Sequence, residues 1–279
     1  MSGFQKMIKY IAMAFGFFLA FVIISSIVSV VLGVAGLGML WDGTQTTTEI
    51  QVEDEAQYSE EFADVENLTM DIAISNLTII EGTEFKVEGT NLTNTFSAKQ
   101  RGNTLHIKED KFNLIGMSDI VSNIVITIPK GTKLNKVELE MGAGNAKIDN
   151  LVTQQIELDL GAGNIEIESI EAQRAEIQGG AGKITINNAK LANMNLETGI
   201  GKFEFAGRLE GNNSVECGVG KVDIALQNSQ DDYSIYTQTG LGAIRFNGSD
   251  CADKTTYGTG KTRLRIEGGV GSIDITTQE

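Results

Sequence analysis

Residues 158–173 read LDLGAGNIEIESIEAQ, and closely similar stretches stand 19 residues before and after them. The earlier stretch is LEMGAGNAKIDNLVTQ (139–154), and the later one is IQGGAGKITINNAKLA (177–192). The repeated Gly-x-Gly pairs are Gly142 and Gly144, Gly161 and Gly163, Gly180 and Gly182, Gly199 and Gly201, Gly218 and Gly220, Gly240 and Gly242, and Gly269 and Gly271. The first four intervals are 19 residues long, and the last two are 22 and 29. A fixed period of this length is typical of a repeat protein.

Apolar and polar residues alternate on both sides of each glycine pair. Three residues before the pair stand Leu139, Leu158 and Ile177, and six residues after its first glycine stand Ile148, Ile167 and Ile186. A period of two indicates strands with one buried face. Residues 137–279 are therefore predicted to form an all-β, single-chain β-solenoid, or β-helix, of about 19-residue rungs, in which each strand pairs with its counterpart in the next rung. The glycines are expected to turn the corner of each coil.

The residue between the two glycines is apolar in every repeat, which predicts an inward side chain. The column comprises Ala143, Ala162, Ala181, Ile200, Val219, Leu241 and Val270. The position before the first glycine holds Cys217 between the Thr198 and Thr239 repeats, so Cys217 is predicted to be a reduced, buried core residue. A single disulfide with Cys251 is the alternative.

The N-terminal part of the chain predicts a membrane anchor. Residues 11–41 contain no charged side chain and are long enough to cross a bilayer as an uncleaved signal-anchor helix. Lys6 and Lys9 precede this segment, and nine acidic residues follow before the next basic one, so the N-terminus is expected in the cytoplasm and the C-terminal domain outside the cell. Small residues at four-residue spacing in the helix, such as Ala12, Gly16 and Ala20, could mediate a homodimer.

These observations divide the chain into five segments. Residues 1–10 are a short cytoplasmic tail, 11–41 the transmembrane helix, 42–61 an acidic stalk, 62–136 a β-rich cap with irregular early rungs, and 137–279 the regular solenoid. Beyond the helix lie all 37 acidic residues and 20 of the 22 basic ones, a formal charge near −17. Such a surface argues against nucleic acid as a partner.

No motif predicts catalysis. The stretch YGTGKT (257–262) lacks the first glycine of a phosphate-binding loop and precedes no helix. His106 is the only histidine and has no neighbour in sequence with which to form a triad or a zinc site. Paired carboxylates could cleave a polysaccharide, but the few aromatic residues make this the least favoured function.

Two outward columns of carboxylates form the candidate metal site, which consists of Glu138, Glu140, Glu157 and Asp159. Their oxygens suit Ca²⁺, the only cofactor that the sequence suggests, although a solvated acidic face explains the same pattern. Across the corner, Asn145, Asn164 and Lys183 begin a polar ladder that could form hydrogen bonds along the stack or offset the acids. The long final interval inserts NGSDCADKTTYGTGKT (247–262), predicted to be a projecting loop and a contact site.

The phrase ITIPKGTKLNKVELEMGAGNAKI, the repeated GAG-x-I-x-I and the closing RIEGGVGSIDI resemble the bacterial putative-adhesin domain of unknown function over residues 62–276. The resemblance implies a β-solenoid from the cell envelope of Gram-positive bacteria, without known catalytic residues, and with relatives beside Lia-type envelope-stress systems. We therefore expect a non-enzymatic binding, adhesin-like or scaffolding protein with an envelope protein or glycan as its ligand. The alternative is an accessory or sensor protein of an envelope-stress system.

Overall fold

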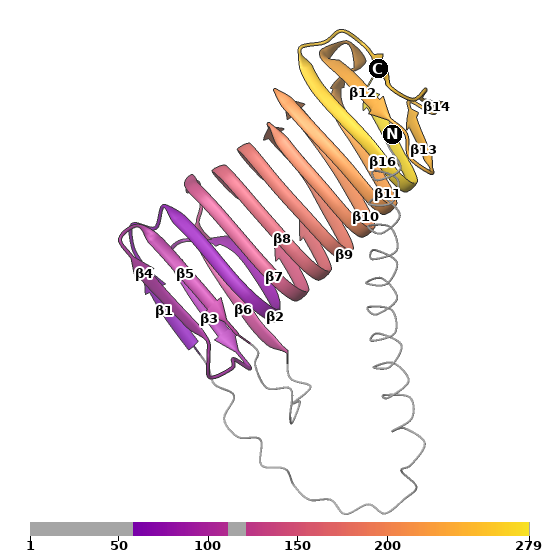
Figure 1. The fold of residues 1–279 in the computed structure, drawn as a ribbon. Helices are drawn as coiled ribbons and strands as arrows, with labels where there is room; N and C mark the ends of the chain where they lie inside the picture. Colours follow the sequence, from indigo (N-terminus) through magenta and orange to yellow (C-terminus); the bar gives the residue numbers. More distant parts are fainter. Residues whose placement is uncertain (1–57, 111–120, 279) are drawn as a thin grey trace, which may run out of the picture. The chain divides into compact units, whose positions relative to one another are not determined.

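The computed structural model describes residues 58–110 and 121–278, which are almost entirely β-structure (Figure 1). The strands are β1 (Tyr58–Phe62), β2 (Asn67–Gly82), β3 (Phe85–Thr90), β4 (Ser97–Arg101), β5 (Thr104–Glu109), β6 (Ser122–Pro129), β7 (Leu134–Ile148), β8 (Leu151–Ile167), β9 (Ile170–Ala192), β10 (Met194–Glu210), β11 (Asn212–Ser229), β12 (Tyr233–Gln238), β13 (Ala243–Phe246), β14 (Ser249–Asp250), β15 (Thr255–Tyr257) and β16 (Thr262–Gln278). One short 3₁₀ helix, η1 (Gln230–Asp232), precedes β12.

Within these described ranges no helix is long and apolar enough to cross a membrane. The transmembrane helix predicted for residues 11–41, and the cytoplasmic tail before it, lie outside the described residues. Strand β1 begins at Tyr58, inside the segment assigned to the acidic stalk.

The rungs stack in parallel, and each residue pairs with the residue one repeat later. Leu139 lies opposite Leu158, and Leu158 opposite Ile177. The same register continues through β10 and β11, so strands β7 to β11 form consecutive coils of one long sheet. The predicted all-β architecture of stacked rungs is thus confirmed.

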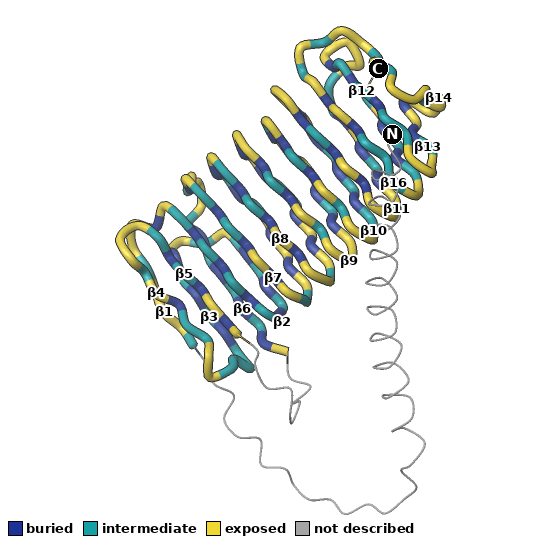
Figure 2. The backbone as a smooth tube through the Cα atoms, viewed as in Figure 1, coloured by how far each residue is buried: buried dark blue, intermediate teal, exposed yellow. Residues whose placement is uncertain are grey.

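Alternating side chains fill the interior of the stack. The burial pattern along each strand alternates between buried and accessible positions (Figure 2). Phe203 and Phe205 lie in adjacent inward positions of β10, with nearly parallel rings whose centroids are 6.5 Å apart. Buried apolar residues therefore form a continuous core from rung to rung.

The second glycine of each pair meets the backbone of an adjacent rung. Gly163 has a φ of +132°, and a Cβ atom at this position would lie 1.9 Å from the carbonyl oxygen of Gly144. Gly182 repeats this geometry on Gly163, with a φ of +147°. Only glycine provides both the backbone conformation and the close approach between rungs.

The prediction that the residue between the glycines points inward is wrong. Ile200 is 64% exposed and Leu241 is 84% exposed, while Val219 and Val270 are also exposed. The strand alternation does not continue through the corner, because the unusual conformation of the second glycine in rungs such as β10 and β11 turns the intervening side chain outward. The stack therefore carries an apolar column on its outside.

The first complete rung is β2, which has no Gly-x-Gly sequence. It pairs in parallel with β7 over most of its length, and Ile74 lies opposite Ala143. Ala73 and Ser75 stand where the later rungs have glycines. On its other side, β2 pairs with β5 and β6, and the antiparallel strands β4, β3 and β1 complete this end of the sheet.

At the other end, the order of the rungs departs from the order of the chain. Strand β16, the last in sequence, lies between β11 and the rung formed by β12 and β13 (Figure 1). The expectation that each repeat pairs with the next one therefore fails here. The late insert, expected to project as a loop, instead supplies β14 and β15, which pair antiparallel with β13 and β12 and cover the end.

The corner glycines of the last two repeats follow this changed order. Gly271 has a φ of +139°, and a Cβ atom there would lie 1.8 Å from the carbonyl oxygen of Gly220, so the corner of β16 rests on that of β11. A Cβ atom at Gly242 would in turn lie 1.9 Å from the carbonyl oxygen of Gly271. The prediction that Gly242 follows Gly220 in the stack, with Gly271 beyond it, is therefore wrong, because β16 occupies the intervening layer.

The corner at Gly242 also differs from the others in its backbone. Gly242 lies in a bend between β12 and β13 rather than within a continuous strand, and its φ is outside the left-handed range that Gly271 and the earlier second glycines adopt. The predicted role of Gly242 as a corner glycine with an unusual conformation is thus wrong. Glycine is required there only by the close approach of the Gly271 backbone.

This rung order also changes the surroundings of Cys217. The cysteine is buried and free, as predicted, but it lies between Thr198 and Gly268 rather than between two threonines. Cys251, in the insert, is also free.

Candidate binding surfaces

The acidic columns stack as the sequence predicted, with Glu138 opposite Glu157 and Glu140 opposite Asp159. Lys136 forms ion pairs with both Glu138 and Glu157, the second at 3.1 Å, and Thr69 donates a hydrogen bond to Glu138. Lys136 lowers the pKa of Glu138, against the effect of partial burial. One lysine therefore offsets one of the two negative charges that Glu138 and Glu157 bring to this column.

The other pair, Glu140 and Asp159, is exposed to solvent. Across residues 58–110 and 121–278, no three His, Cys, Asp or Glu side chains come together in a geometry suited to a metal ion. The calcium site at the four carboxylates and its alternative, a solvated acidic face, therefore both stay predictions.

Across the corner, the polar ladder forms hydrogen bonds along the stack. Asn164 donates to Asn145, Asn145 to Asn76, and Asn76 to Asn123, at 3.1 to 3.2 Å. In the later rungs, lysines occupy the ladder positions and form ion pairs with acids that stand two residues after the ladder position in the same rung or the next one. The ion pairs run through Lys183, Glu204, Lys202, Asp223, Lys221, Asp274, Arg245 and Asp250.

Glu204 occupies the most strongly perturbed position in this network. Lys183 lies 2.5 Å from its carboxylate, and Lys202 contacts the other oxygen. These two lysines lower the pKa of Glu204 from 4.5 to about 2, and Glu204 raises the pKa of Lys202. The lysine face of the solenoid is therefore an internally balanced set of charges.

Between the acidic columns and the polar ladder runs the apolar column at the corner, which we call the corner ridge. In spatial order it comprises Ile74, Ala143, Ala162, Ala181, Ile200, Val219, Val270 and Leu241. Apart from Ile74 on β2, the large side chains lie in the four consecutive rungs from β10 to the rung of β12 and β13. Such exposed apolar surface marks an interaction site when it is contiguous.

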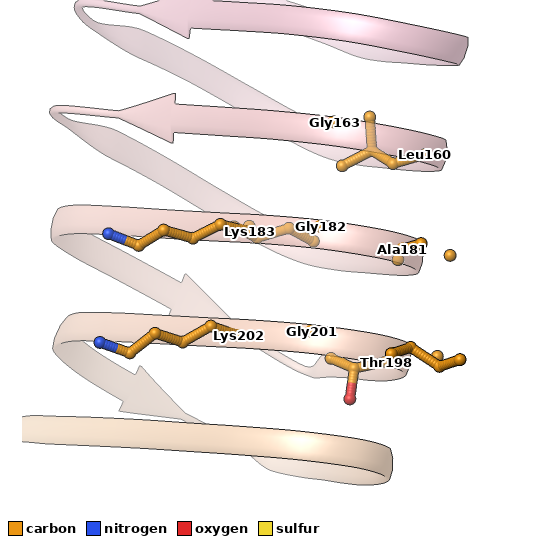
Figure 3. Close-up of a pocket in the computed structure, with 13 residues that line it drawn as sticks. Leu160, Gly163, Ala181, Gly182, Lys183, Thr198, Gly201 and Lys202 are labelled. Atoms are coloured by element: carbon orange, nitrogen blue, oxygen red, sulfur yellow. The ribbon is translucent and has the colours of Figure 1, made fainter. Parts of the chain in front are cut away.

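A shallow pocket of about 20 Å³ opens beside the ridge between β9 and β10 (Figure 3). It exists because Gly179 and Thr198 stand where the preceding rung has the larger Leu160. Figure 3 shows Lys183 and Lys202 extending in parallel from these rungs, away from the corner. The pocket holds about one water molecule and is too small for an organic ligand.

A larger hollow, which we call the polar groove, lies on the third side of the coils and has a volume of about 700 Å³. Its lining is mostly amide and charged: Asn135, Gln154, Gln155, Glu171, Ala172, Gln173, Arg174, Lys190, Leu191, Ala192, Asn193 and Glu210. The amides of Gln154 and Asn135 are hydrogen bonded at 2.9 Å across one rung, and Lys190 pairs with Glu171 at 3.2 Å. Two acids and two bases leave the groove without net charge.

Sequence reasoning identified neither the corner ridge nor the polar groove. The ridge was interpreted as core because its residues are apolar. The groove is formed by side chains from several coils, such as Glu171 and Lys190, that are not adjacent in sequence. Its lining is rich in amides, which are common on any protein surface and so gave no signal. A change of periodicity at each glycine pair is the signal that could have revealed the ridge.

The remaining chemical candidates form no reactive site within the described part of the chain. His106 lies on β5 between Thr69 and Lys99 on the flanking strands. In the insert, the backbone N–H of Ala252 donates to the Tyr257 hydroxyl at 2.6 Å, so this segment is held by its own contacts. Sequence reasoning also missed Glu109, which is fully buried and accepts hydrogen bonds from the Thr93 N–H and the Ser122 hydroxyl.

The stacked parallel rungs define the class of protein as a β-solenoid. Residues 65–259 match the family described as Toastrack DUF4097, and the chain belongs to this family. The predicted resemblance to an adhesin-like domain of unknown function is thereby confirmed. A comparison with curated protein sequences finds no match.

Two solved structures illustrate the fold. The crystal structure of a "putative adhesin" from Bacteroides fragilis has a TM-score of 0.55 and 18% identity, over 80% of this chain and 97% of that one. A "putative adhesin" from Parabacteroides distasonis has a TM-score of 0.46 and 13% identity, over 79% of this chain and 96% of that one. At these identities the likeness to the first shows a common fold.

Proposed function

We propose that this chain is a membrane-anchored, extracytoplasmic scaffold that binds a neutral glycan of the cell envelope without chemically changing it. The polar groove carries this proposal. Its volume of about 700 Å³ lies within the 300–1,000 Å³ usual for ligand sites. The adhesin names of the structural neighbours and the uncharged segment 11–41 support an envelope location.

The chemistry of the groove favours a ligand rich in hydroxyl groups. Each amide offers both donors and an acceptor, which matches a sugar hydroxyl. Gln154 and Gln173 are one rung apart, so the lining repeats about every 4.8 Å and suits an extended oligomer. The two acids and two bases of the lining cancel, so the groove itself favours neither a polyanion nor a polycation, and the acidic character of the whole chain disfavours a polyanion further.

Binding of a single oligosaccharide is expected to be weak, with a Kd of about 1 mM, because none of the lining residues is aromatic. The test uses saturation-transfer NMR on the full-length protein in detergent with N-acetylchitotetraose, maltotetraose and cellotetraose. At least one neutral tetramer is expected to bind, whereas tetragalacturonate does not. Gln154→Ala with Gln173→Ala should abolish the signal.

Gln178→Ala is the matched control, since it removes an exposed amide of β9 that does not line the groove. Absence of binding by all three neutral tetramers, or equal loss in the control, would overturn the assignment of the groove. The location is tested separately by adding protease to intact cells, where degradation of the solenoid is the expected result. Protection from protease would refute the extracytoplasmic location.

A further inference from the structure

We infer that the corner ridge is the contact surface for a second copy of this chain, and that the two solenoids associate side by side with their axes parallel. The inference is independent of the polar groove, which lies on another side of the coils. It starts from the exposed aliphatic side chains of Ile200, Val219, Val270 and Leu241, which occupy adjacent rungs.

The ridge matches another ridge of the same kind in both shape and spacing. Its side chains recur at the distance between paired strands, about 4.8 Å. Two such columns placed side by side can therefore be in contact along several rungs at once. A column of isoleucine, valine and leucine gains free energy from being withdrawn from water, and within the single chain about half or more of each of these residues stays exposed.

The charges beside the ridge select the relative orientation. In β10, Glu197 lies three residues before Ile200, and Lys202 lies two residues after it. In β11, Glu216 and Lys221 flank Val219 in the same way. Over these two rungs one side of the ridge is thus acidic, whereas the other side, which we call the lysine side, carries lysines whose charges are balanced by Glu204 and Asp223.

A two-fold axis parallel to the solenoid places the acidic side of one copy against the lysine side of the other. Glu197 then faces the partner copy's lysine column at the level of Lys202, and Glu216 faces it at the level of Lys221. The antiparallel arrangement places acid against acid, which is unfavourable. Charge complementarity therefore selects the parallel dimer.

The acidic side also lacks partners within the described residues. Glu197 and Glu216 are exposed and lie directly opposite each other in adjacent strands, and they take part in none of the ion pairs formed among residues 58–110 and 121–278. Like charges in this position repel. Lys202 and Lys221 already contact acids of their own chain, but both remain partly exposed and can donate further hydrogen bonds.

The experiment is disulfide cross-linking in cells that produce the full-length chain, after Cys217→Thr and Cys251→Ser have removed the native thiols. In the parallel dimer each ridge residue lies next to its own copy. Ile200→Cys alone and Val219→Cys alone should therefore form dimers under mild oxidation. The control, Ala225→Cys, introduces an exposed thiol in the same strand as Val219 but away from the corner.

Cross-linking at Ile200→Cys should exceed that at Ala225→Cys several-fold, and Glu197→Lys with Glu216→Lys should remove the excess. Coexpression of Ile200→Cys and Leu241→Cys chains detects the antiparallel arrangement, in which these two positions meet. Preferential formation of that mixed dimer would overturn the parallel orientation. Cross-linking no stronger than the control at every ridge position would overturn the dimer itself.

Discussion

Replacing Gly163 with alanine should destabilise the solenoid more than almost any other exchange of one hydrogen for a methyl group. The residue has a φ of +132°, where a side chain costs about 1–3 kcal/mol. The new Cβ would also lie 1.9 Å from the carbonyl oxygen of Gly144, which is backbone and cannot rotate away.

The two effects add, because the neighbouring rung must move while the corner remains strained. Overpacking of this kind typically costs about 1–3 kcal/mol, so we expect a total of about 2–6 kcal/mol for Gly163→Ala. That is a large part of the roughly 5–15 kcal/mol by which folded domains are stable. Since each rung contacts only its neighbours, the loss should also divide the unfolding transition into two steps.

Two further variants separate conformational strain from steric overlap. Gly102 has a φ of +58°, and a Cβ there meets nothing within 4 Å, so Gly102→Ala should cost only about 1–2 kcal/mol. Gly142 has an ordinary φ, but a Cβ there would lie 2.6 Å from the Ala73 carbonyl oxygen. The loss of stability of Gly142→Ala therefore measures the cost of the steric overlap without conformational strain.

The assay is urea unfolding of the full-length protein in mild detergent, followed by far-UV circular dichroism. The free energy of unfolding comes from linear extrapolation, with the slope checked for loss of two-state behaviour. If Gly163→Ala were no less stable than Gly102→Ala, the close approach between rungs would not be what selects glycine at the corners.

Three other perturbations test the ladders. Lys183 and Lys202 lower the pKa of Glu204 to about 2, so its stabilising contribution is present above the unfolded-state pKa near 4.5 and is lost as the pH falls toward 2. Glu204→Gln should therefore cost about 1 kcal/mol at neutral pH and flatten the acid side of a plot of thermal midpoint against pH. An unchanged slope would refute the pairing. Asn145→Ala breaks two hydrogen bonds of the asparagine ladder and should lower the free energy of unfolding in urea by about 1–2 kcal/mol. The control Asn187→Ala should change it little, and equal effects of the two variants would show that the ladder adds no stability. Millimolar Ca²⁺ should leave the thermal midpoint unchanged, because Lys136 already pairs with Glu138 and Glu157. The double variant Glu140→Gln with Asp159→Asn removes a repulsion and should raise the free energy of unfolding by up to about 1 kcal/mol. A calcium-induced rise in the midpoint that this variant loses would instead establish the cation site.

The sequence was sufficient to predict the stacked rungs, because apolar columns such as Leu139, Leu158 and Ile177 could be aligned at a constant interval. Constant spacing in the sequence means constant register in the sheet, which the paired strands display. The segment of β2 was predicted only as part of a cap with irregular early rungs, because Ala73 and Ser75 replace the glycines and 69 residues separate Asn76 from its neighbour Asn145.

The candidate surfaces were harder to predict than the fold. Hydrophobicity alone placed Ile200 and Val219 in the core, and only the backbone conformation at Gly201 and Gly220 shows that they point outward. Likewise, the position of β16 is set by packing at the end of the stack. The spacing between Gly240 and Gly269 records that an insertion occurred, but not where the following strand would lie.

The position of β16 has a consequence for how the molecule is made. The ribosome delivers residues 233–246 before residues 262–278, yet the earlier segment rests on the later one in the finished stack. The layer formed by β12 and β13 therefore has no surface to pack on until residues 262–278 have been translated. For the same reason, a protease or an early stop codon that removes residues 262–278 deletes an inner layer and detaches the layer beyond it. A clean C-terminal truncation of this solenoid must therefore end after β11, at Ser229.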